Sequence, residues 1–306
     1  MTMQNTPGGT VTIARRDVAR IGYGAMQLER LSHDPDAAAS VLRHALDHGV
    51  DHIDTAEFYR NGFVNSVIRS VAGVRNDVFV ATKIGATPNP GGPLPLRAAQ
   101  RPEQLRASVE DNLRSLGTDI LDLVYLRRMD VGPGLRPEGD QIVPMDDQLA
   151  TLTALRDEGK IAALGISAVD ADGVRHALPA GITAVQNAYS LVDRQFEGML
   201  ELCSAEGVAW VPYFPLGGAF PGLAKVTEQP AVLDAATRLG ATPSQIGLAW
   251  LLQHSPDIAL IPGTASIEHL DENLAVASIE LDAETLATLD VLEPVGAGEI
   301  QWATEV

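Results

Sequence analysis

The chain has 306 residues, of which 45% are hydrophobic and 20% are charged, a composition typical of a globular protein with a large buried core. The chain has 22 Lys and Arg residues together and 40 Asp and Glu residues together, so its net charge is -18 at pH 7. Such an acidic surface repels phosphate backbones and anionic lipid. We therefore expect neither nucleic acid nor a membrane surface as a partner.

The sequence predicts neither a membrane span nor a signal peptide. No apolar run reaches the roughly 18 residues of a membrane span, and residues 1–16 lack the apolar stretch of a signal peptide. The one cysteine, Cys203, can form no disulfide within the chain and is interpreted as a small buried helix residue. This cysteine usage fits a reducing compartment, and we expect a cytoplasmic protein.

Short apolar runs alternate with amphipathic stretches from residue 20 onward. Strands are predicted at 21–24, 50–54, 78–83, 120–126, 163–167, 184–187, 208–212 and 258–261. Helices are predicted at 35–49, 63–73, 102–116, 146–158, 170–177, 195–206, 229–240, 243–254, 266–276 and 282–292. Residues 1–19 are expected to form an N-terminal hairpin or cap, and residues 294–306 a C-terminal tail.

The repeated order of strand and helix predicts a parallel sheet covered by helices. Eight such units in about 250 residues favour the α/β class and a single (β/α)8 TIM barrel domain over 1–306, rather than an open doubly wound sheet. An open sheet usually carries Gly-x-Gly-x-x-Gly after its first strand. Residues 22–27 read Gly-Tyr-Gly-Ala-Met-Gln, which lacks the third glycine, and we expect no helix directly after them.

Three connections are long and rich in Pro and Gly, and each follows the carboxyl end of a predicted strand. They span 84–101, 127–145 and 213–228. Long ordered loops are usually functional, and the carboxyl face of a barrel carries its active site. We therefore expect the active site on this face.

Three residues at two strand ends suggest proton chemistry. Asp54 ends the second predicted strand, Lys83 ends the third, and Tyr59 follows Asp54 by five residues. Asp54 could hold Lys83, which would lower the cost of a tyrosinate, and Tyr59 could give a proton to a carbonyl oxygen as a hydride reaches the carbon. The alternative is a structural ion pair beside a loop aromatic.

The motifs at these strand ends resemble those of the aldo-keto reductase superfamily. They are Asp-Thr-Ala-x-x-Tyr at 54–59 and Ala-Thr-Lys at 81–83, with further matches in order at 22–28, 116–123, 164–167, 185–189, 212–217 and 261–273. The resemblance covers nearly the whole chain. It implies the barrel fold and the reduction of a small-molecule carbonyl substrate, an aldehyde or ketone, to an alcohol.

The chain departs from the family's catalytic tetrad of Asp, Tyr, Lys and His at one position. Arg127 stands where the histidine is expected. Arginine can donate hydrogen bonds to a carbonyl oxygen but cannot relay a proton. Its charge should favour the Tyr59 anion and lower the pKa of Tyr59 below about 10. Alternatively, Arg127 turns outward and pairs with Asp130 or Asp140.

The resemblance implies NADPH or NADP as the cofactor, with NADH as the alternative. Around the first strand and its turn the implied residues are Gly24, Ala25, Met26 and Asp54. Ser167 and Gln186 match the positions that hold the nicotinamide carboxamide, and Tyr213 matches the aromatic that stacks on the nicotinamide. Phe214, Leu216 and Gly217 match the pyrophosphate loop. Gly263, Thr264, Ser266, His269, Glu272 and Asn273 match the adenosine end.

Some of the usual cofactor donors are missing. The asparagine that normally follows the serine is Ala168. Gly263 and Ala265 occupy the positions where a Lys or Arg is often found beside the 2′-phosphate. His269 stands where Arg or Gln is common. NADPH remains preferred, with weaker discrimination against NADH.

Two histidines four residues apart, His44 and His48, superficially resemble a zinc-binding helix. No Glu follows His44, and the predicted helix ends at Gly49, away from the expected mouth of the barrel. We interpret the pair as a solvated helix end and predict no metal. A metal-dependent hydrolase is not indicated either, because His-x-His and carboxylate clusters at strand ends are absent.

The segments 123–128 and 211–218 are similar to those of a bacterial subgroup with pyridoxal reductase activity, which also carries arginine at the histidine position. This similarity implies pyridoxal, reduced to pyridoxine, as the substrate. The alternative function is a cofactor-binding regulatory or assembly subunit on the same fold, like the potassium-channel β subunits, with chemistry impaired by Arg127. The sequence assigns no oligomeric state.

Overall fold

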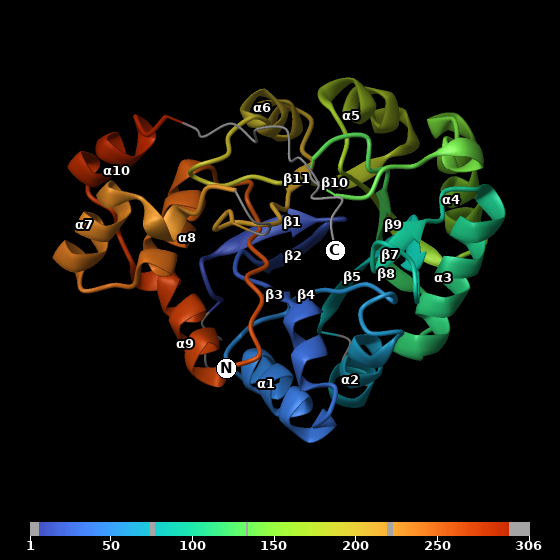
Figure 1. Ribbon diagram of the computed structural model, residues 1–306, viewed down its shortest axis with the longest axis horizontal. Helices are drawn as coiled ribbons and strands as arrows, with labels where there is room; N and C mark the ends of the chain where they lie inside the picture. The colour runs from blue at the N-terminus through green and yellow to red at the C-terminus, as the bar shows by residue number, and fades with distance from the viewer. Residues whose placement is uncertain (1–5, 74–76, 133, 219–222, 294–306) are drawn as a thin grey trace.

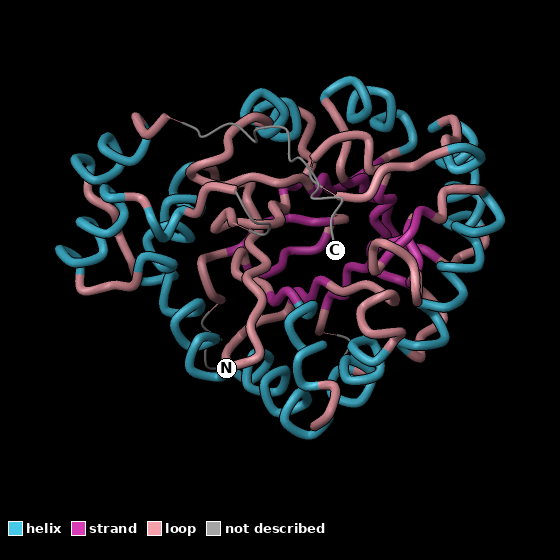
Figure 2. The backbone as a smooth tube through the Cα atoms, viewed as in Figure 1, coloured by secondary structure: helices cyan, strands magenta, loops and turns pink. Residues whose placement is uncertain are grey.

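The computed structural model describes residues 6–73, 77–132, 134–218 and 223–293, so the predicted tail 294–306 lies outside the described residues. Strands occupy the centre of the molecule and helices surround them (Figure 1). Figure 2 shows the same arrangement as an outer ring of helices around the strands, with loops between them.

The central sheet has seven strands, which neighbour one another in chain order and pair in parallel. They are β3 (Tyr23–Gly24), β4 (His52–Asp54), β5 (Phe79–Ile84), β8 (Leu121–Arg127), β9 (Ile161–Ser167), β10 (Ile182–Gln186) and β11 (Ala209–Trp210). The predicted α/β class with a parallel sheet is confirmed.

The predicted eighth strand, 258–261, forms only isolated parallel bridges, one between Ile258 and Trp210 and one between Leu260 and Ile21. The Gly22 amide donates to the Leu260 carbonyl at 2.8 Å, and the Ala259 amide donates to the Trp210 carbonyl at 2.9 Å. The segment therefore runs between β11 and β3. The Gly24 amide also donates to the Pro262 carbonyl, at 3.4 Å.

Ten α-helices are described, each within two residues of its predicted ends: α1 (Pro35–Asp47), α2 (Phe63–Ala72), α3 (Pro102–Leu116), α4 (Met145–Asp157), α5 (Ala171–Ala177), α6 (Glu197–Ala205), α7 (Pro230–Leu239), α8 (Pro243–His254), α9 (Ile267–Ala275) and α10 (Ala283–Asp290). Proline at the first helical position starts several of them, where its missing amide hydrogen costs nothing. None of the described helices combines the length and apolar character of a membrane span.

Short 3-10 helices lie in the connections: η1 (Ala25–Leu31), η2 (Gly139–Gln141), η3 (Leu178–Ala180), η4 (Val226–Glu228) and η5 (Val276–Ser278). The expectation that no helix follows the first strand is wrong, because η1 begins directly after β3. Ala25 is buried at its start and Leu28 at its middle, so burial of these apolar side chains fixes the segment.

Two antiparallel hairpins flank the central sheet. The first pairs β1 (Thr10–Ile13) with β2 (Arg16–Ala19), and its buried Val11, Ile13 and Val18 share a core cluster with inward residues of the sheet. Figure 1 places this hairpin across the centre of the molecule. The second pairs β6 (Ala86–Pro88) with β7 (Leu96–Ala98), so the connection 84–101, predicted as a loop, contains paired strands.

The contact between β3 and the segment after 258–261 requires glycine on both sides. A Cβ added to Gly263 would lie 2.5 Å from the Gly24 carbonyl oxygen, and one added to Gly24 would overlap the Ile261 carbonyl oxygen. The two backbone segments lie so close together that no methyl group fits between them. Glycine at both positions therefore allows β3 to pack directly against the segment that follows 258–261.

We predict that Gly24→Ala lowers the free energy of unfolding by about 1–3 kcal/mol, because the added methyl group overpacks this contact. The matched control is Gly198→Ala in α6, where an added Cβ meets nothing within 4 Å. That variant should be more stable by about 0.5–1 kcal/mol, the usual gain of alanine over glycine in a helix. Urea denaturation of both variants measures the difference, and equal stability of Gly24→Ala and the wild type would contradict the steric argument.

Candidate active site

Lys83 lies at the centre of the site and joins the two residues predicted to act with it. Its Nζ donates to Oδ1 of Asp54, to the Tyr59 hydroxyl at 3.3 Å and to the Thr55 carbonyl at 3.1 Å. The side chains of Lys83 and Asp54 are only 9% and 5% exposed. The structure therefore brings the predicted Asp, Tyr and Lys together in one buried cluster at the carboxyl ends of β4 and β5.

Gln186, at the end of β10, extends this cluster across the sheet. Its Nε2 donates to Oδ2 of Asp54 at 2.9 Å, while its Oε1 is buried and has no hydrogen-bond partner among the described residues. Ser167 pairs in register with Gln186 on one side and with Arg127 on the other. Three predicted site residues thus form a row across β8, β9 and β10, with one free acceptor oxygen.

A buried polar network behind the strands holds the cluster in position. The Thr55 hydroxyl donates to Asn65 Oδ1 at 2.8 Å, and the Thr82 hydroxyl donates to Asn112 Oδ1 at 2.6 Å. Asn65 Nδ2 in turn donates to Asn112 Oδ1 at 3.2 Å. These positioning residues were missed by the sequence analysis, although a threonine stands beside each catalytic candidate, Asp54 and Lys83.

The electrostatics of Tyr59 correct one prediction. Burial raises the pKa of Tyr59 above its ordinary value, and the Asp54 carboxylate raises it further. The Lys83 ammonium and Arg127 guanidinium lower this pKa, but they do not overcome the loss of water. The predicted pKa below about 10 is therefore wrong, because desolvation disfavours the phenolate more than the two cations stabilise it. Tyr59 is a protonated donor at neutral pH.

Lys83 remains charged in this buried position. Burial lowers the pKa of its ammonium, but the Asp54 carboxylate and the Tyr59 hydroxyl outweigh that effect and raise the pKa above its usual range. A charged Lys83 can therefore stabilise negative charge that develops on the Tyr59 oxygen. His52 precedes Asp54 by two residues in β4. It is buried, and this burial lowers the pKa of its imidazole to about 4.

Arg127 lies on the same face of β8 as Tyr125, two residues earlier, because side chains alternate along a strand, and Tyr125 is buried in the core cluster inside the sheet. Its charge lowers the pKa of both Tyr59 and Tyr213, whose pKa values burial raises. Asp130 and Asp140, its alternative partners, are bonded to other arginines, at 3.0 Å to Arg128 and at 2.6 Å to Arg101. Within the described part of the chain, Arg127 makes no side-chain ion pair.

The backbone around Arg127 is fixed by a residue that the sequence analysis did not single out. Gln100 Nε2 donates to the Arg127 carbonyl at 2.8 Å and to the Gly85 carbonyl at 2.7 Å. Gln148 Nε2 supports Gln100 by donating to its side-chain oxygen at 2.8 Å. This bridge ties the loop after β5 to the loop after β8, and no local sequence signal could have revealed it.

Tyr213, Phe214 and Gly217, predicted for the nicotinamide and the pyrophosphate, lie in the loop after β11. The Tyr213 and Phe214 rings meet edge to face, with centroids 4.9 Å apart. Phe214 has a φ of 55° and Ala168 a φ of 56°, both in the left-handed region. Non-glycine residues in this region store strain that is common at functional sites. Gly217 has a φ of 66° and accepts the turn without strain.

The predicted adenosine end lies where β3 meets α9. The Tyr23 hydroxyl donates to the Thr264 carbonyl at 2.5 Å, and Ser266 caps α9 by accepting from the His269 amide. The amide of Ser266 donates to the Thr264 hydroxyl at 3.0 Å. On the same helix, His269 is exposed, and Glu272 and Asn273 are half-buried. Leu216, predicted for the pyrophosphate, packs against Gly247 of α8. A helix start with free amides suits an anion.

Comparison with known proteins assigns the family. The model of the Aldo/keto reductase family matches residues 20–294. The chain is 41% identical over 288 residues to pyridoxine 4-dehydrogenase of Escherichia coli, covering 92% of this chain and 97% of that protein. It is also 30% identical over 315 residues to probable aldo-keto reductase 1 of Glycine max, covering 92% of this chain and 87% of that protein.

A solved structure has the same fold. An aldo-keto reductase from Klebsiella pneumoniae, crystallised with NADPH, superposes with a TM-score of 0.77 at 27% identity, covering 94% of this chain and 95% of that one. The chain belongs to the aldo/keto reductase family, and the family predicted from the sequence motifs is confirmed.

The phenols offer a test of the site's electrostatics. Burial raises the pKa of each of the five tyrosines, so no tyrosine of the native protein should ionise at or below pH 10. Because these pKa values are raised in the folded state, the associated stability is complete below about pH 10, the unfolded value, and is lost as the pH rises further. Tyrosinate ultraviolet absorbance during an alkaline titration measures the ionisation.

The assignment to Tyr59 comes from the difference between wild type and Tyr59→Phe. Arg127→Met should raise the pKa of Tyr59 further, because the guanidinium lowers it. A native ionisation step below pH 10 that disappears in Tyr59→Phe would contradict the conclusion that burial dominates.

Proposed function

We propose that the chain reduces a carbonyl compound to an alcohol with NADPH, and that pyridoxal, reduced to pyridoxine, is its substrate. The observation that carries the proposal is the buried Lys83 ammonium, which joins the Asp54 carboxylate to the Tyr59 hydroxyl. A structural ion pair alone would not require a tyrosine hydroxyl on the same ammonium. The intact trio favours an enzyme over a regulatory subunit with impaired chemistry.

The residues present fit a nicotinamide cofactor. Gln186 has a buried side-chain oxygen without a partner among the described residues, and a carboxamide N–H is a donor that would satisfy it. Ser167 lies beside it in register. Two related structures, each 27% identical, were crystallised with NADPH and with NADP. Because the net charge of -18 opposes a phosphate, local donors such as the free amides at the start of α9 would have to hold it.

The chain's own residues supply the proton and control its release. When bound, NADPH supplies a hydride to the carbonyl carbon. The Tyr59 hydroxyl holds the proton that the carbonyl oxygen needs, and its raised pKa keeps that proton in place at neutral pH. Lys83 stabilises the charge left on the phenol oxygen, and Asp54 holds Lys83 in position. Donors already fixed in a buried site need no rearrangement during the reaction.

The substrate follows from Arg127 and from the relative at 41% identity. The name pyridoxine 4-dehydrogenase refers to oxidation of the alcohol that pyridoxal reduction would form. Pyridoxal carries a ring oxygen ortho to its aldehyde, and a guanidinium can donate two hydrogen bonds to neighbouring oxygens. Arg127 lies near enough to Tyr59 and Tyr213 for its charge to lower the pKa of both phenols.

Three further proposals concern the setting of the site. We take 258–261 as the eighth member of a closed barrel, because it pairs with both β11 and the chain before β3. We take residues 1–306 as one domain. The cytoplasmic location remains a prediction from composition.

Replacing Tyr59 with Phe should lower kcat for carbonyl reduction by about 10²–10⁴, the usual contribution of general-acid catalysis. NADPH affinity should change little, because the hydroxyl faces the substrate side. The measurement is NADPH oxidation by absorbance with pyridoxal, paired with fluorescence titration of NADPH. A Tyr59→Phe protein with full kcat would disprove this assignment.

The substrate is tested with Arg127→Met and Arg127→His, each assayed with pyridoxal and with an uncharged aldehyde of similar size. Arg127→Met should slow both reactions and should slow pyridoxal reduction more, because it removes the charge and the hydrogen-bond donors. Arg127→His should recover the uncharged aldehyde better than pyridoxal. If all three proteins reduce both aldehydes equally well, Arg127 does not contact the substrate and pyridoxal loses its main support.

A further inference from the structure

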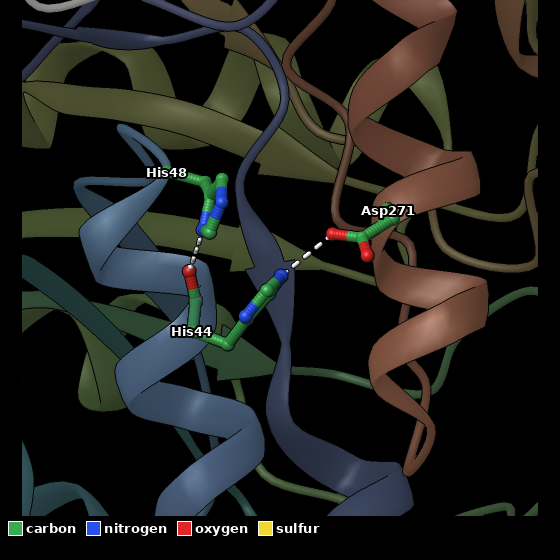
Figure 3. A group of neighbouring side chains, drawn as sticks. All are labelled: His44, His48 and Asp271. Carbon is green, nitrogen blue, oxygen red and sulfur yellow. Dashed lines mark hydrogen bonds and ion pairs between the residues drawn. The ribbon is translucent and has the colours of Figure 1, made fainter.

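His44 lies in the last turn of α1 and His48 directly follows that helix, and α9 places a carboxylate beside them (Figure 3). His44 Nε2 is hydrogen-bonded to Asp271 Oδ1 at 2.6 Å. One ligand atom from each of His44, His48 and Asp271 lies within 4.8 Å of the other two. The sequence analysis interpreted the histidines as a solvated helix end and could not include Asp271, which is 227 residues from His44.

We propose that His44, His48 and Asp271 bind a divalent transition-metal ion of the Zn²⁺ type and thereby link α1 to α9. Two imidazoles and one carboxylate are a donor set that zinc uses, with water in the fourth position. Imidazole donors select zinc, copper and nickel rather than magnesium or calcium, which prefer oxygen ligands. Among the described residues, this is the one group of three or more such side chains.

His48 is already oriented as a ligand. Its Nδ1 lies 2.7 Å from the His44 carbonyl oxygen, which can only accept a hydrogen bond, so Nδ1 carries the proton. In the neutral ring, the lone pair is then on Nε2, the other nitrogen. Metal-binding histidines commonly donate their second ring nitrogen to a backbone carbonyl in this way, which fixes the tautomer and the ring direction.

The ion would replace the hydrogen bond between His44 and Asp271. Binding forms bonds to both imidazoles and the carboxylate, and in the neutral His44 ring the proton moves from Nε2 to Nδ1. Ligands of tetrahedral zinc are about 3.3 Å apart for bonds of about 2.0–2.1 Å, so the three donors must approach one another. The Asp271 side chain is 55% exposed and His48 is exposed, so both can rotate without disturbing the core.

The setting favours a cation and gives the site a structural consequence. The two imidazole rings are stacked, with centroids 4.0 Å apart, so the histidines already lie side by side at the end of α1. The chain's charge of -18 attracts metal ions. Asp271 lies in α9, five residues after Ser266, which caps the start of that helix. A bound ion would therefore hold the first half of α9 against the end of α1. The site is separate from the Lys83 cluster, and its test needs no reductase activity.

The experiment measures binding of ZnCl₂ to the full chain without an affinity tag, after treatment with a chelator, by isothermal titration calorimetry. Wild type should bind one Zn²⁺ per chain. His48→Gln and Asp271→Asn, which keep the side-chain size, should each raise the Kd at least tenfold. Since zinc binds only the folded site, added Zn²⁺ should also raise the Tm of wild type and not that of Asp271→Asn.

The matched control is His176→Gln. His176 is likewise an exposed histidine bonded to a carboxylate, at 2.5 Å from Asp146, but it has no third ligand in the described chain. This variant should bind Zn²⁺ as tightly as wild type. The proposal is overturned if wild type shows no saturable binding below about 1 mM, which corresponds to about 4 kcal/mol, or if His48→Gln and Asp271→Asn both bind as wild type does.

Discussion

The buried ion pair between Lys83 and Asp54 is the interaction on which the site depends. Two charges can leave water only where protein groups replace the solvent, and an incomplete set of partners would be strongly destabilising. Here the Lys83 ammonium uses its three donors on Asp54, Tyr59 and the Thr55 carbonyl, while Asp54 also accepts from Gln186. The pairing of β4 with β5 must therefore be held in register, because a slip of one residue would turn Lys83 to the opposite face of the sheet.

The other face of the same strands supplies that constraint. Side chains alternate across a strand, so Thr55 and Thr82 point away from their neighbours Asp54 and Lys83. Their hydroxyls meet Asn65 of α2 and Asn112 of α3, which ties the two strands to the two helices that cover them. A fully satisfied buried network of this kind specifies one arrangement. Two adjacent pairs of residues, Asp54 with Thr55 and Thr82 with Lys83, thus place the candidate catalytic groups on one face and anchoring hydroxyls on the other.

Local patterns were sufficient to predict the helices, seven parallel strands and the trio of catalytic candidates. Apolar periodicity and helix caps are local, and a parallel sheet brings strand ends to one edge. Contacts between distant residues were not predictable: Gln100 reaches the Arg127 carbonyl across two loops, and Asp271 meets His44 across 227 residues. The pKa of Tyr59 was misjudged for a related reason, since counting nearby cations omits the desolvation that only the packed structure reveals.

The raised pKa of Tyr59 also changes the role that Arg127 can have. Lys83 is balanced by Asp54, and neither cation overcomes the burial of the phenol, so a second positive charge is not what prepares Tyr59 for reaction. Arg127 has no ion-pair partner among the described residues, and its charge reaches both Tyr59 and Tyr213. A histidine at this position could be neutral, whereas arginine is always charged. In a chain of net charge -18, a cation without an ion-pair partner makes its own surroundings more positive than the field of the whole molecule, and under the proposed function this is where an anionic group on the substrate would bind.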